Sequence, residues 1–309
     1  MSVFTALGAH IVDVLGRPVQ AIPPGQGGAL LDEIRITAAG AAGGTAVDLA
    51  RLGTTVRSVG AIGADALGTF LRLQLEDAGV DTSRLVVLPG AQTSSTILPI
   101  RANGERPSLH VRGVTPLLRA SHVPASALEG TDHLHVGGPD VLGAFAEDVL
   151  PGLLRDARRA GTVVSTDLLA SAQGGALERL AGVLAQTDHL LINADQGALL
   201  TGLDDVTKAA TALRSHVAGV VVLTTGADGG VLADDDGLHV FPALPVPVVD
   251  TTGCGDGFSA GYVYALSLGW PPREACRLGT ACASMVAQTL GSDGVTGLED
   301  ALALAERLR

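Results

Sequence analysis

The sequence is poor in aromatic residues and in cysteine. Phe, Trp and Tyr make up 3% of its 309 residues, although 47% of the residues are hydrophobic. We therefore expect a core of Ala, Val and Leu, with the 41 glycines serving turns and close packing. The 3 cysteines cannot all pair and show no C-x-x-C spacing, so reduced thiols are favoured over a disulfide framework.

Positive charge is also scarce. Lys208 and the arginines, which are spread along the chain, total 20 basic residues against 32 acidic ones, so the formal net charge is −12. Without a basic cluster, a nucleic-acid surface is not expected. No apolar run approaches the roughly 18 to 20 residues of a membrane span, and no basic leader precedes the first apolar stretch, MSVFTALGAHIVDVLG. These absences favour a cytoplasmic protein without a nucleic-acid or membrane partner.

Short apolar runs alternate with segments of helical period along the chain. TVVSTD, HLLIN and VVVLTT are short continuous apolar runs, whereas GTAVDLARLG, DALGTFLRLQLEDAG and ALERLAGVLAQ have helical spacing. Repeated units of this kind predict a mostly parallel sheet covered by helices on both faces. The fold class is therefore α/β, and we expect one large domain over residues 1–309.

Two segments interrupt this alternation. Residues 14–38 are rich in Pro and Gly, and residues 91–117 read as two strands around an Asn103-Gly104 turn. Together they could form a small β lid over the carboxyl edge of the sheet, where ligands bind in open α/β folds. Exposed lid strands invite edge pairing, so a homodimer through the lid is expected. Ordinary surface loops are the alternative that the pattern leaves open.

The stretch DTTGCGDGFSAG, residues 250–261, carries the chemistry. Consecutive N–H groups of GCGD at a helix start would form an anion site, reinforced by the helix dipole. A carboxylate inside such a site repels the charge that the amides attract, so Asp256 is better explained as a base. It would take the proton of a hydroxyl that attacks a phosphate. The alternative, that Asp256 only caps the helix, leaves the surrounding glycines unexplained.

Two common nucleotide motifs are excluded. Lys208 lies between Thr207 and Ala209, without the Gly-Lys-Ser/Thr context of a P-loop. In GCGDGFSAG, Phe258 occupies a glycine position that the dinucleotide fingerprint requires.

DTTGCGDGFSAG resembles the C-terminal signature DTxGAGD of the ribokinase-like, PfkB-type carbohydrate kinases. GGTAVDLARLG resembles their N-terminal signature GGxxxNxAxxLxxLG, and GAIGADALGTFLRLQLEDAGVD and VVVLTTGADGGVL match further segments in the same order. The resemblance covers nearly the whole chain. It implies the ribokinase-like α/β fold with a β lid, and phosphorylation of a sugar or sugar-like molecule by ATP with Mg²⁺ and, in many members, K⁺.

The resemblance also implies roles for individual residues. Asp256 would be the catalytic base, with an anion hole from the amides of Gly253, Cys254 and Gly255. The residues expected to contact substrate are Asp13, Gly43, Gly44 and Asp48. The residues expected to bind the nucleotide are Asn193, Thr224, Gly226 and Gly229. Asp250 and Thr252 would hold the monovalent cation, completed by carbonyls from residues 289–297, and Gln196 would reach Mg²⁺ through water.

Three positions depart from the family pattern. Asp48 stands where the pattern has Asn, which makes the group an acceptor only and favours substrates with several hydroxyl or amine donors. Gln196 replaces the Glu of NxxE, so we expect weaker or altered Mg²⁺ dependence. Cys254 replaces an Ala; a helix N-terminus favours the thiolate, but a small neutral filler is the preferred interpretation.

We therefore expect an ATP-dependent carbohydrate kinase. A nucleoside or pyrimidine kinase of the same fold is one alternative, although the scarcity of aromatics weakens base stacking. A sugar-binding protein that has lost phosphotransfer is the other, suggested by Gln196 and Asp48. Turnover would separate the binding protein from the kinases.

Overall fold

A computed structural model describes residues 2–103, 105–169, 175–292 and 294–308. Within these residues the main sheet has nine strands in the order β13-β12-β11-β10-β9-β8-β1-β4-β5. All neighbours are parallel except β12, which runs antiparallel to β11 and β13. In chain order the strands are β1 (Val3–Gly8), β4 (Thr55–Gly63), β5 (Asp81–Leu88), β8 (His133–Gly137), β9 (Val163–Asp167), β10 (His189–Asn193), β11 (Val220–Thr224), β12 (Gly230–Asp234) and β13 (Gly237–Phe241).

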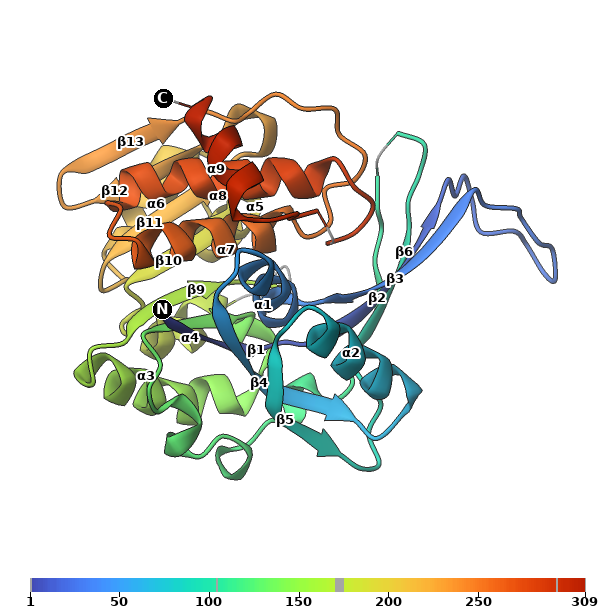
Figure 1. The fold of residues 1–309 in the computed structure, drawn as a ribbon, viewed down its shortest axis with the longest axis horizontal. Coiled ribbons are helices and arrows are strands. Elements are labelled where there is room, and N and C mark those ends of the chain that lie inside the picture. The colour runs from blue at the N-terminus through green and yellow to red at the C-terminus, as the bar shows by residue number, and fades with distance from the viewer. Residues whose placement is uncertain (1, 104, 170–174, 293, 309) are drawn as a thin grey trace.

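Helices cover both faces of this sheet (Figure 1). One apolar cluster joins one face to α1 (Ala41–Arg51), α2 (Ala66–Asp77), α7 (Cys254–Ser267), α8 (Pro272–Ala287) and α9 (Leu298–Glu306). A second cluster joins the other face to α3 (Leu150–Arg159), α4 (Ala176–Leu184), α5 (Ala194–Thr201) and α6 (Val206–Arg214). A π-helical turn, Phe145–Val149, leads into α3. Short 3-10 turns span Thr115–Leu117, Ala120–His122, Ala125–Leu128, Pro139–Val141 and Gly226–Asp228.

The predicted α/β architecture is confirmed. The runs predicted as buried strands are β9, β10 and β11, and each has a buried centre because helices pack on both sides of it. No helix in the described part of the chain is long and apolar enough to cross a membrane.

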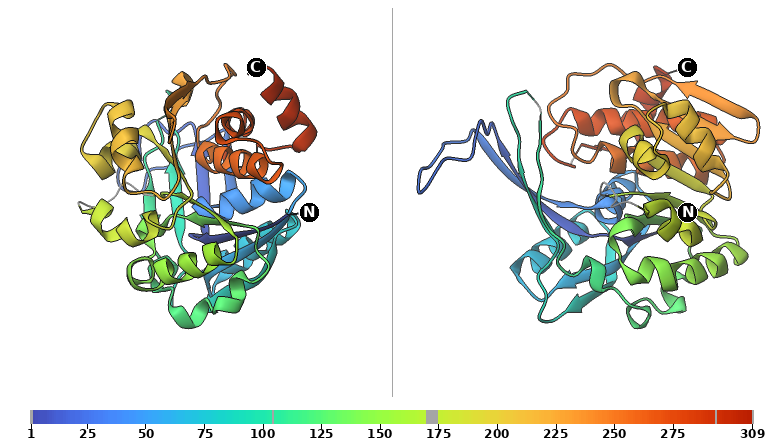
Figure 2. Two further views of the ribbon diagram at one scale, coloured as in Figure 1. Left: turned by 90° about the vertical axis from the view of Figure 1, so that its left-hand side faces the viewer. Right: turned by 180° about the vertical axis from the view of Figure 1, so that it is seen from behind.

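A second sheet projects from the body of the molecule (Figures 1 and 2). Its order is β3-β2-β6-β7, built from β2 (Ile11–Arg17), β3 (Glu33–Ala39), β6 (Ser95–Pro99) and β7 (Leu109–Val111). β6 and β7 lie within the predicted segment 91–117 and pair antiparallel, whereas β2 begins at Ile11 and β3 ends at Ala39, both beyond the predicted bounds 14–38. Gly104 of the predicted turn lies outside the described residues.

Side chains alternate across the second sheet, as the pleat requires. On one face Asp13 lies opposite Thr37 of β3 and Thr96 of β6, and all three are buried. On the other face Val14 lies in one row with Ile36, Ile97 and Leu109, of which the last three are 45%, 56% and 56% exposed. We call this row the outer apolar row.

The order in which the chain adds strands to the main sheet reverses at β1, which lies between β4 and β8. The next two strands of this sheet, β4 and β5, lie on one side of β1. The strands from β8 to β13 lie on its other side. Ligands of open α/β sheets bind beside the carboxyl ends of strands at such a point. The loops after β1, β8 and β9 are therefore the region in which a site is expected.

Candidate active site

Asp256 lies in the first turn of α7. Gly253 is the N-cap residue, with φ 80°, and no side chain caps the helix. A β-carbon on Gly253 would lie 2.7 Å from the Cβ of Ser292, so both backbone conformation and space require glycine there. The interpretation of Asp256 as a cap does not hold, because its carboxylate accepts no bond from the helix start.

Only some of the amides of this first turn are available to a ligand. The Cys254 N–H donates to the Thr251 carbonyl at 3.3 Å, and the Gly257 N–H donates to the Gly253 carbonyl at 2.9 Å. Within the described residues, the N–H groups of Gly255 and Asp256 have no acceptor. A helix end with free N–H groups and its dipole attracts an anion.

The N-terminal half of α1 packs against this turn. A β-carbon on Gly44 would overlap the carboxylate of Asp256, whereas one on Gly43 would make an ordinary contact of 3.5 Å with His10 Cδ2. Gly44 thus leaves the space that the Asp256 carboxylate occupies. The chain brings Gly43, Gly44 and Asp256 together although more than 200 residues separate them.

Asp256 is surrounded by other carboxylates. Burial, together with repulsion from Asp167, Asp48 and Asp13, raises the pKa of Asp256 well above its usual value, while Arg106 opposes this shift. Arg106 belongs to the segment between β6 and β7 and donates from Nε to the Thr251 hydroxyl at 3.1 Å. A carboxyl group with a raised pKa holds a proton more readily, as a general base must.

Asp13 is 8% exposed and lies on the inner face of the second sheet. Burial raises the pKa of Asp13 to about 6, although a hydrogen bond from Thr96 and the charge of Arg106 oppose the shift. Asp48 lies one helical turn beyond Gly44 and is fully buried. Its contact with substrate stays a prediction.

Two histidines belong to this region. His10, in the loop between β1 and β2, went unnoticed in the sequence. It is fully buried, its Nδ1 lies 3.0 Å from the Gly8 carbonyl, and burial lowers its pKa to about 4, so the ring is neutral. The available signal was its position in GAHIVD, directly after the first strand. His135 Nε2 lies 3.4 Å from Asp167 Oδ2, and Asp167 Oδ1 accepts from the Gly138 N–H at 3.2 Å.

The residues predicted to bind the nucleotide largely meet in one cavity. Its volume is about 500 Å³, and Thr224, Gly226 and Gly229 line it together with Cys254 and Gly255 of the GCGD turn. A β-carbon on Gly229 would overlap the backbone of Phe241 and Pro242, and the residue has φ 88°. This turn therefore needs glycine and holds β11 and β12 against the cavity.

Asn193 is the strand partner of Thr224, but neither Asn193 nor Gln196 lines this cavity, and the two residues bond to each other. The Asn193 side chain accepts from the Gln196 N–H at 2.8 Å, and the Asn193 N–H donates to Gln196 Oε1 at 3.0 Å. Gln196 Nε2 also donates to the Leu168 carbonyl at 2.8 Å. This capping box starts α5. The Gln196 amide is thereby engaged at both ends, which disfavours it as a group that orients metal-bound water.

The predicted cation residues form a buried turn. Asp250 and Thr252 are 5% and 6% exposed. Asp250 Oδ1 accepts from the Thr252 N–H at 3.1 Å and from its hydroxyl at 2.9 Å, and Oδ2 accepts from the Gly291 N–H at 3.0 Å. Asp293, within the predicted carbonyl segment, lies outside the described residues. The oxygen donors suit a hard monovalent cation, yet the carboxylate is satisfied by protein donors alone.

Cys254 is a neutral thiol. Burial, with repulsion from Asp250 and other carboxylates, raises its pKa to about 12. The helix N-terminus does not outweigh these effects. The interpretation as a small filler is therefore favoured over a thiolate.

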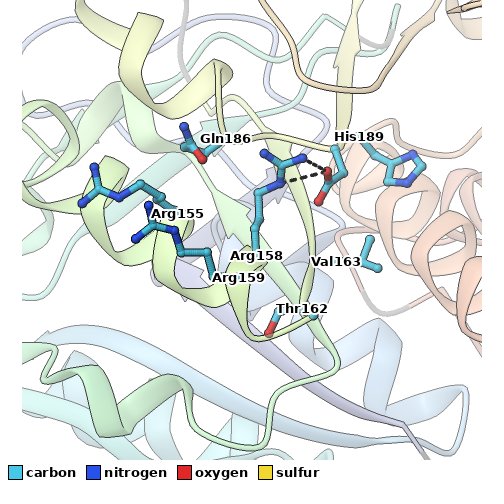
Figure 3. A pocket seen from close by; sticks show the side chains of 9 residues that line it. Arg155, Arg158, Arg159, Thr162, Val163, Gln186 and His189 are labelled. Carbon is cyan, nitrogen blue, oxygen red and sulfur yellow. Dashed lines mark hydrogen bonds and ion pairs between the residues drawn. The ribbon is translucent and has the colours of Figure 1, made fainter.

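A basic hollow of about 630 Å³, whose lining side chains are drawn in Figure 3, lies where β9 and β10 begin, at the opposite ends of these strands from the site. Arg155, Arg158 and Arg159 line it, and Arg158 pairs with Asp188 at 2.7 Å. Arginines in the last turn of α3 complement the negative end of the helix dipole. This hollow is consequently explained without a ligand.

Comparison with known proteins supports one assignment. The chain matches the description "pfkB family carbohydrate kinase" over residues 5–296. It is 30% identical over 294 residues to a fructokinase of Klebsiella pneumoniae, covering 92% of each chain. It is 28% identical over 292 residues to an ATP-dependent ribose-1-phosphate kinase of Halopiger xanaduensis, covering 93% of this chain and 92% of that protein.

Solved structures share the fold. A ribokinase of Thermotoga maritima superposes with a TM-score of 0.81 at 22% identity, covering 99% of this chain and 100% of that one. Aminoimidazole riboside kinase of Salmonella enterica, solved with aminoimidazole riboside and an ATP analogue, gives 0.80 at 24% identity, covering 98% and 100%. A ribokinase II candidate of E. coli, solved with ATP and Mg²⁺, gives 0.84 at 22%, covering 99% of each. Since the family match spans nearly the whole chain, this protein belongs to the pfkB family of carbohydrate kinases.

Proposed function

We propose that this protein transfers the γ-phosphoryl group of ATP to a hydroxyl of a sugar or sugar-like molecule, with Asp256 as the base. The observation that carries this proposal is the position of Asp256 in an uncapped helix turn in which, within the described residues, the N–H groups of Gly255 and Asp256 have no acceptor. An anion hole and a base would thus lie within one turn of α7. The named activities of the relatives, on sugars and nucleosides, agree with this chemistry.

In the proposed step the acceptor hydroxyl lies between Asp256 and the γ-phosphate. Asp256 takes the hydroxyl proton as the oxygen bonds to phosphorus, and the bond from phosphorus to the bridging oxygen of ADP breaks. The amides of Gly253, Gly255 and Asp256 would offset the charge that develops on the phosphoryl oxygens, and the Cys254 N–H could join them only by leaving the Thr251 carbonyl. Asp256 returns its proton to solvent after the product leaves.

Substrate would lie between the second sheet and the body of the molecule. Asp13, held by Thr96, would accept bonds from acceptor hydroxyls, and Gly43 and Gly44 would let the acceptor approach the backbone. Asp48 would add an acceptor behind Gly44. The second sheet would act as a lid, and its closure would exclude water that otherwise hydrolyses ATP.

Metal ions would assist in two places. Mg²⁺ would accompany the nucleotide and would offset the negative charge of its phosphates. Because the Gln196 amide is engaged in the capping box, we expect the phosphates to supply most of the Mg²⁺ ligands. K⁺ would be held by oxygens of Asp250, Thr252 and neighbouring carbonyls, where it would help to keep the GCGD turn in shape.

We also propose that the lid forms a homodimer. The outer apolar row spans all four lid strands, and within the described residues no element of this chain covers it. The inner face of the same sheet carries Asp13 and would face the substrate. The outer apolar row lies on the opposite face, where a partner could cover it. A second copy supplies an apolar row of equal length, which would bury both rows at once.

The test is ADP release from ATP and Mg²⁺, with and without K⁺, across hexoses, pentoses, polyols, sugar acids and nucleosides. Release that depends on one class of acceptor supports the kinase and identifies its substrate class. Asp256→Asn should abolish that release, while Asp77→Asn, at the exposed end of α2, should leave it intact. Acceptor binding in a thermal-shift assay without any release would instead favour the sugar-binding protein.

A further inference from the structure

The cavity beside the GCGD turn is apolar where a nucleobase would lie. The buried and stacked rings of Phe241 and Phe258 line it, with centroids 5.8 Å apart. Leu244 and Val246 line it from the loop after β13, and Ala283 lines it from α8. None of the described residues that line it is an Asp, Glu, Asn, Gln, Lys, Arg or His. The lining therefore lacks the side chains that usually recognise a base by paired hydrogen bonds.

The polar groups of the lining are hydroxyls, and two of them are already engaged. Ser284 Oγ donates to the Thr280 carbonyl at 2.8 Å, within α8. The Thr251 hydroxyl accepts from Arg106 Nε at 3.1 Å. A hydroxyl can rotate to donate or to accept, so it can pair with the 6-amino group of adenine or with the 6-oxo group of guanine, although Ser284 must release the Thr280 carbonyl before it can donate to a base.

The backbone of the lining loop is also short of donors. Pro242, Pro245 and Pro247 have no N–H, in a stretch of six residues, PALPVP. A backbone N–H that donates to N1 of adenine would reject guanine, because guanine N1 carries a hydrogen and cannot accept. Fewer such donors leave fewer ways to distinguish the two purines.

We propose that the donor site accepts purine nucleoside triphosphates without selecting adenine over guanine or hypoxanthine. This inference rests on the proposed function, since it concerns the phosphate donor of that reaction. The site would select a base by the apolar area that the base buries in the cavity. That area depends on the size of the ring system and hardly on the amino or oxo groups attached to it. A site that hydrogen-bonds its ligand can reject an analogue by about 10⁴-fold or more, whereas an apolar pocket rejects a near-isostere by about 10²-fold at most.

The first experiment measures kcat/KM for ATP, GTP, ITP, CTP and UTP with one saturating acceptor. ATP, GTP and ITP should fall within about tenfold of each other, because no lining group distinguishes them. CTP and UTP should be used less well, since a pyrimidine ring buries less apolar area. A value for GTP about 10³-fold below that for ATP would show that adenine is read by hydrogen bonds, and would overturn the inference.

A binding measurement separates this inference from the proposed function. ADP, GDP, IDP and CDP compete against a fluorescent ADP analogue, without any acceptor present. If no triphosphate supports turnover with any acceptor, the proposed kinase activity fails, yet the competition still reports on base selection. Equal displacement by ADP and GDP supports the inference, and displacement by ADP alone contradicts it.

Two variants sharpen the result. Ser284→Ala and Thr280→Val remove the hydroxyls of α8 without changing the charge of the cavity. The ratio of ADP to GDP affinity should stay within about twofold in both variants, because a hydroxyl favours neither base. A ratio that moves further in either variant would assign base recognition to that hydroxyl. Ala283→Leu, which narrows the cavity, should weaken ADP and GDP together.

Discussion

Gly44 of α1 faces Asp256 of α7 so closely that a β-carbon on Gly44 would overlap the Asp256 carboxylate. The two helices pack against each other on the same side of the main sheet. The position of the proposed base is therefore set jointly by a glycine near the start of the chain and a turn near its end.

Gly44→Ala should displace Asp256 and lower kcat by about 10²-fold, the lower end of what a general base contributes. Gly43→Ala is the matched comparison for kcat, because its β-carbon would make only a 3.5 Å contact with His10 and would not reach Asp256; its effect should fall on KM for the acceptor, which would approach the same backbone. Steady-state kinetics of both variants measure the difference. Equal losses in the two variants would show that the overlap with Asp256 is not the cause.

Asp256→Asn should lower kcat by about 10³-fold, since it removes the proposed base, and at the same time raise the melting temperature at pH 7. The raised pKa of Asp256 means that its ionised form costs folding free energy above the usual carboxyl pKa. An amide of the same shape removes that cost. Calorimetry and turnover on the same preparation test both effects, with Asp77→Asn as control. Turnover within a few-fold of the wild-type value would remove Asp256 as the base.

Asp13 predicts a pH dependence of substrate binding. Burial raises its pKa to about 6, so the carboxylate becomes protonated as the pH falls through this value. A protonated carboxyl accepts fewer bonds from substrate hydroxyls, so KM should rise below about pH 6. Asp13→Asn should raise KM at pH 7.5 and remove this rise. Thr96→Val, which deletes a hydrogen bond that lowers the pKa, should move the inflection to higher pH. An unchanged KM profile in Asp13→Asn would contradict the assignment.

The homodimer is tested at Ile97, which lies near the middle of the outer apolar row and is 56% exposed. Ile97→Asp should yield monomers, because it places a charge in an interface that would otherwise bury two apolar rows. Light scattering coupled to size exclusion measures the mass. Val240→Asp, at a 78% exposed position on the edge strand β13, is the control and should leave the mass unchanged. A monomeric wild-type protein would contradict the proposal outright.

Much of the fold could be predicted because it depends on local patterns. TVVSTD, HLLIN and VVVLTT are short apolar runs bounded by polar residues, and they form strands as predicted; the structure adds that they are neighbours in the sheet. GCGD was recognisable because a helix start rich in glycine with an internal carboxylate is an unusual combination. The two interruptions of the β–α rhythm likewise carry the strands of the second sheet.

Other parts of the site depend on contacts between segments far apart in the chain. In the sequence His10 looks like an ordinary loop residue. The structure shows that it is buried next to Gly43 and that burial lowers its pKa, which keeps the ring neutral. From the sequence, Gln196 is expected to bind Mg²⁺ weakly through water. The structure shows that its amide forms a capping box with Asn193.

By itself, then, the sequence determined the α/β architecture, the strands and the GCGD turn, because hydrophobic period and glycine spacing act within a few residues. Only the tertiary structure decided that Gly44 makes room for Asp256, that Cys254 is a neutral thiol and that the nucleotide cavity is apolar. Those properties follow from burial and from the charges of neighbours, which packing brings together from opposite ends of the chain.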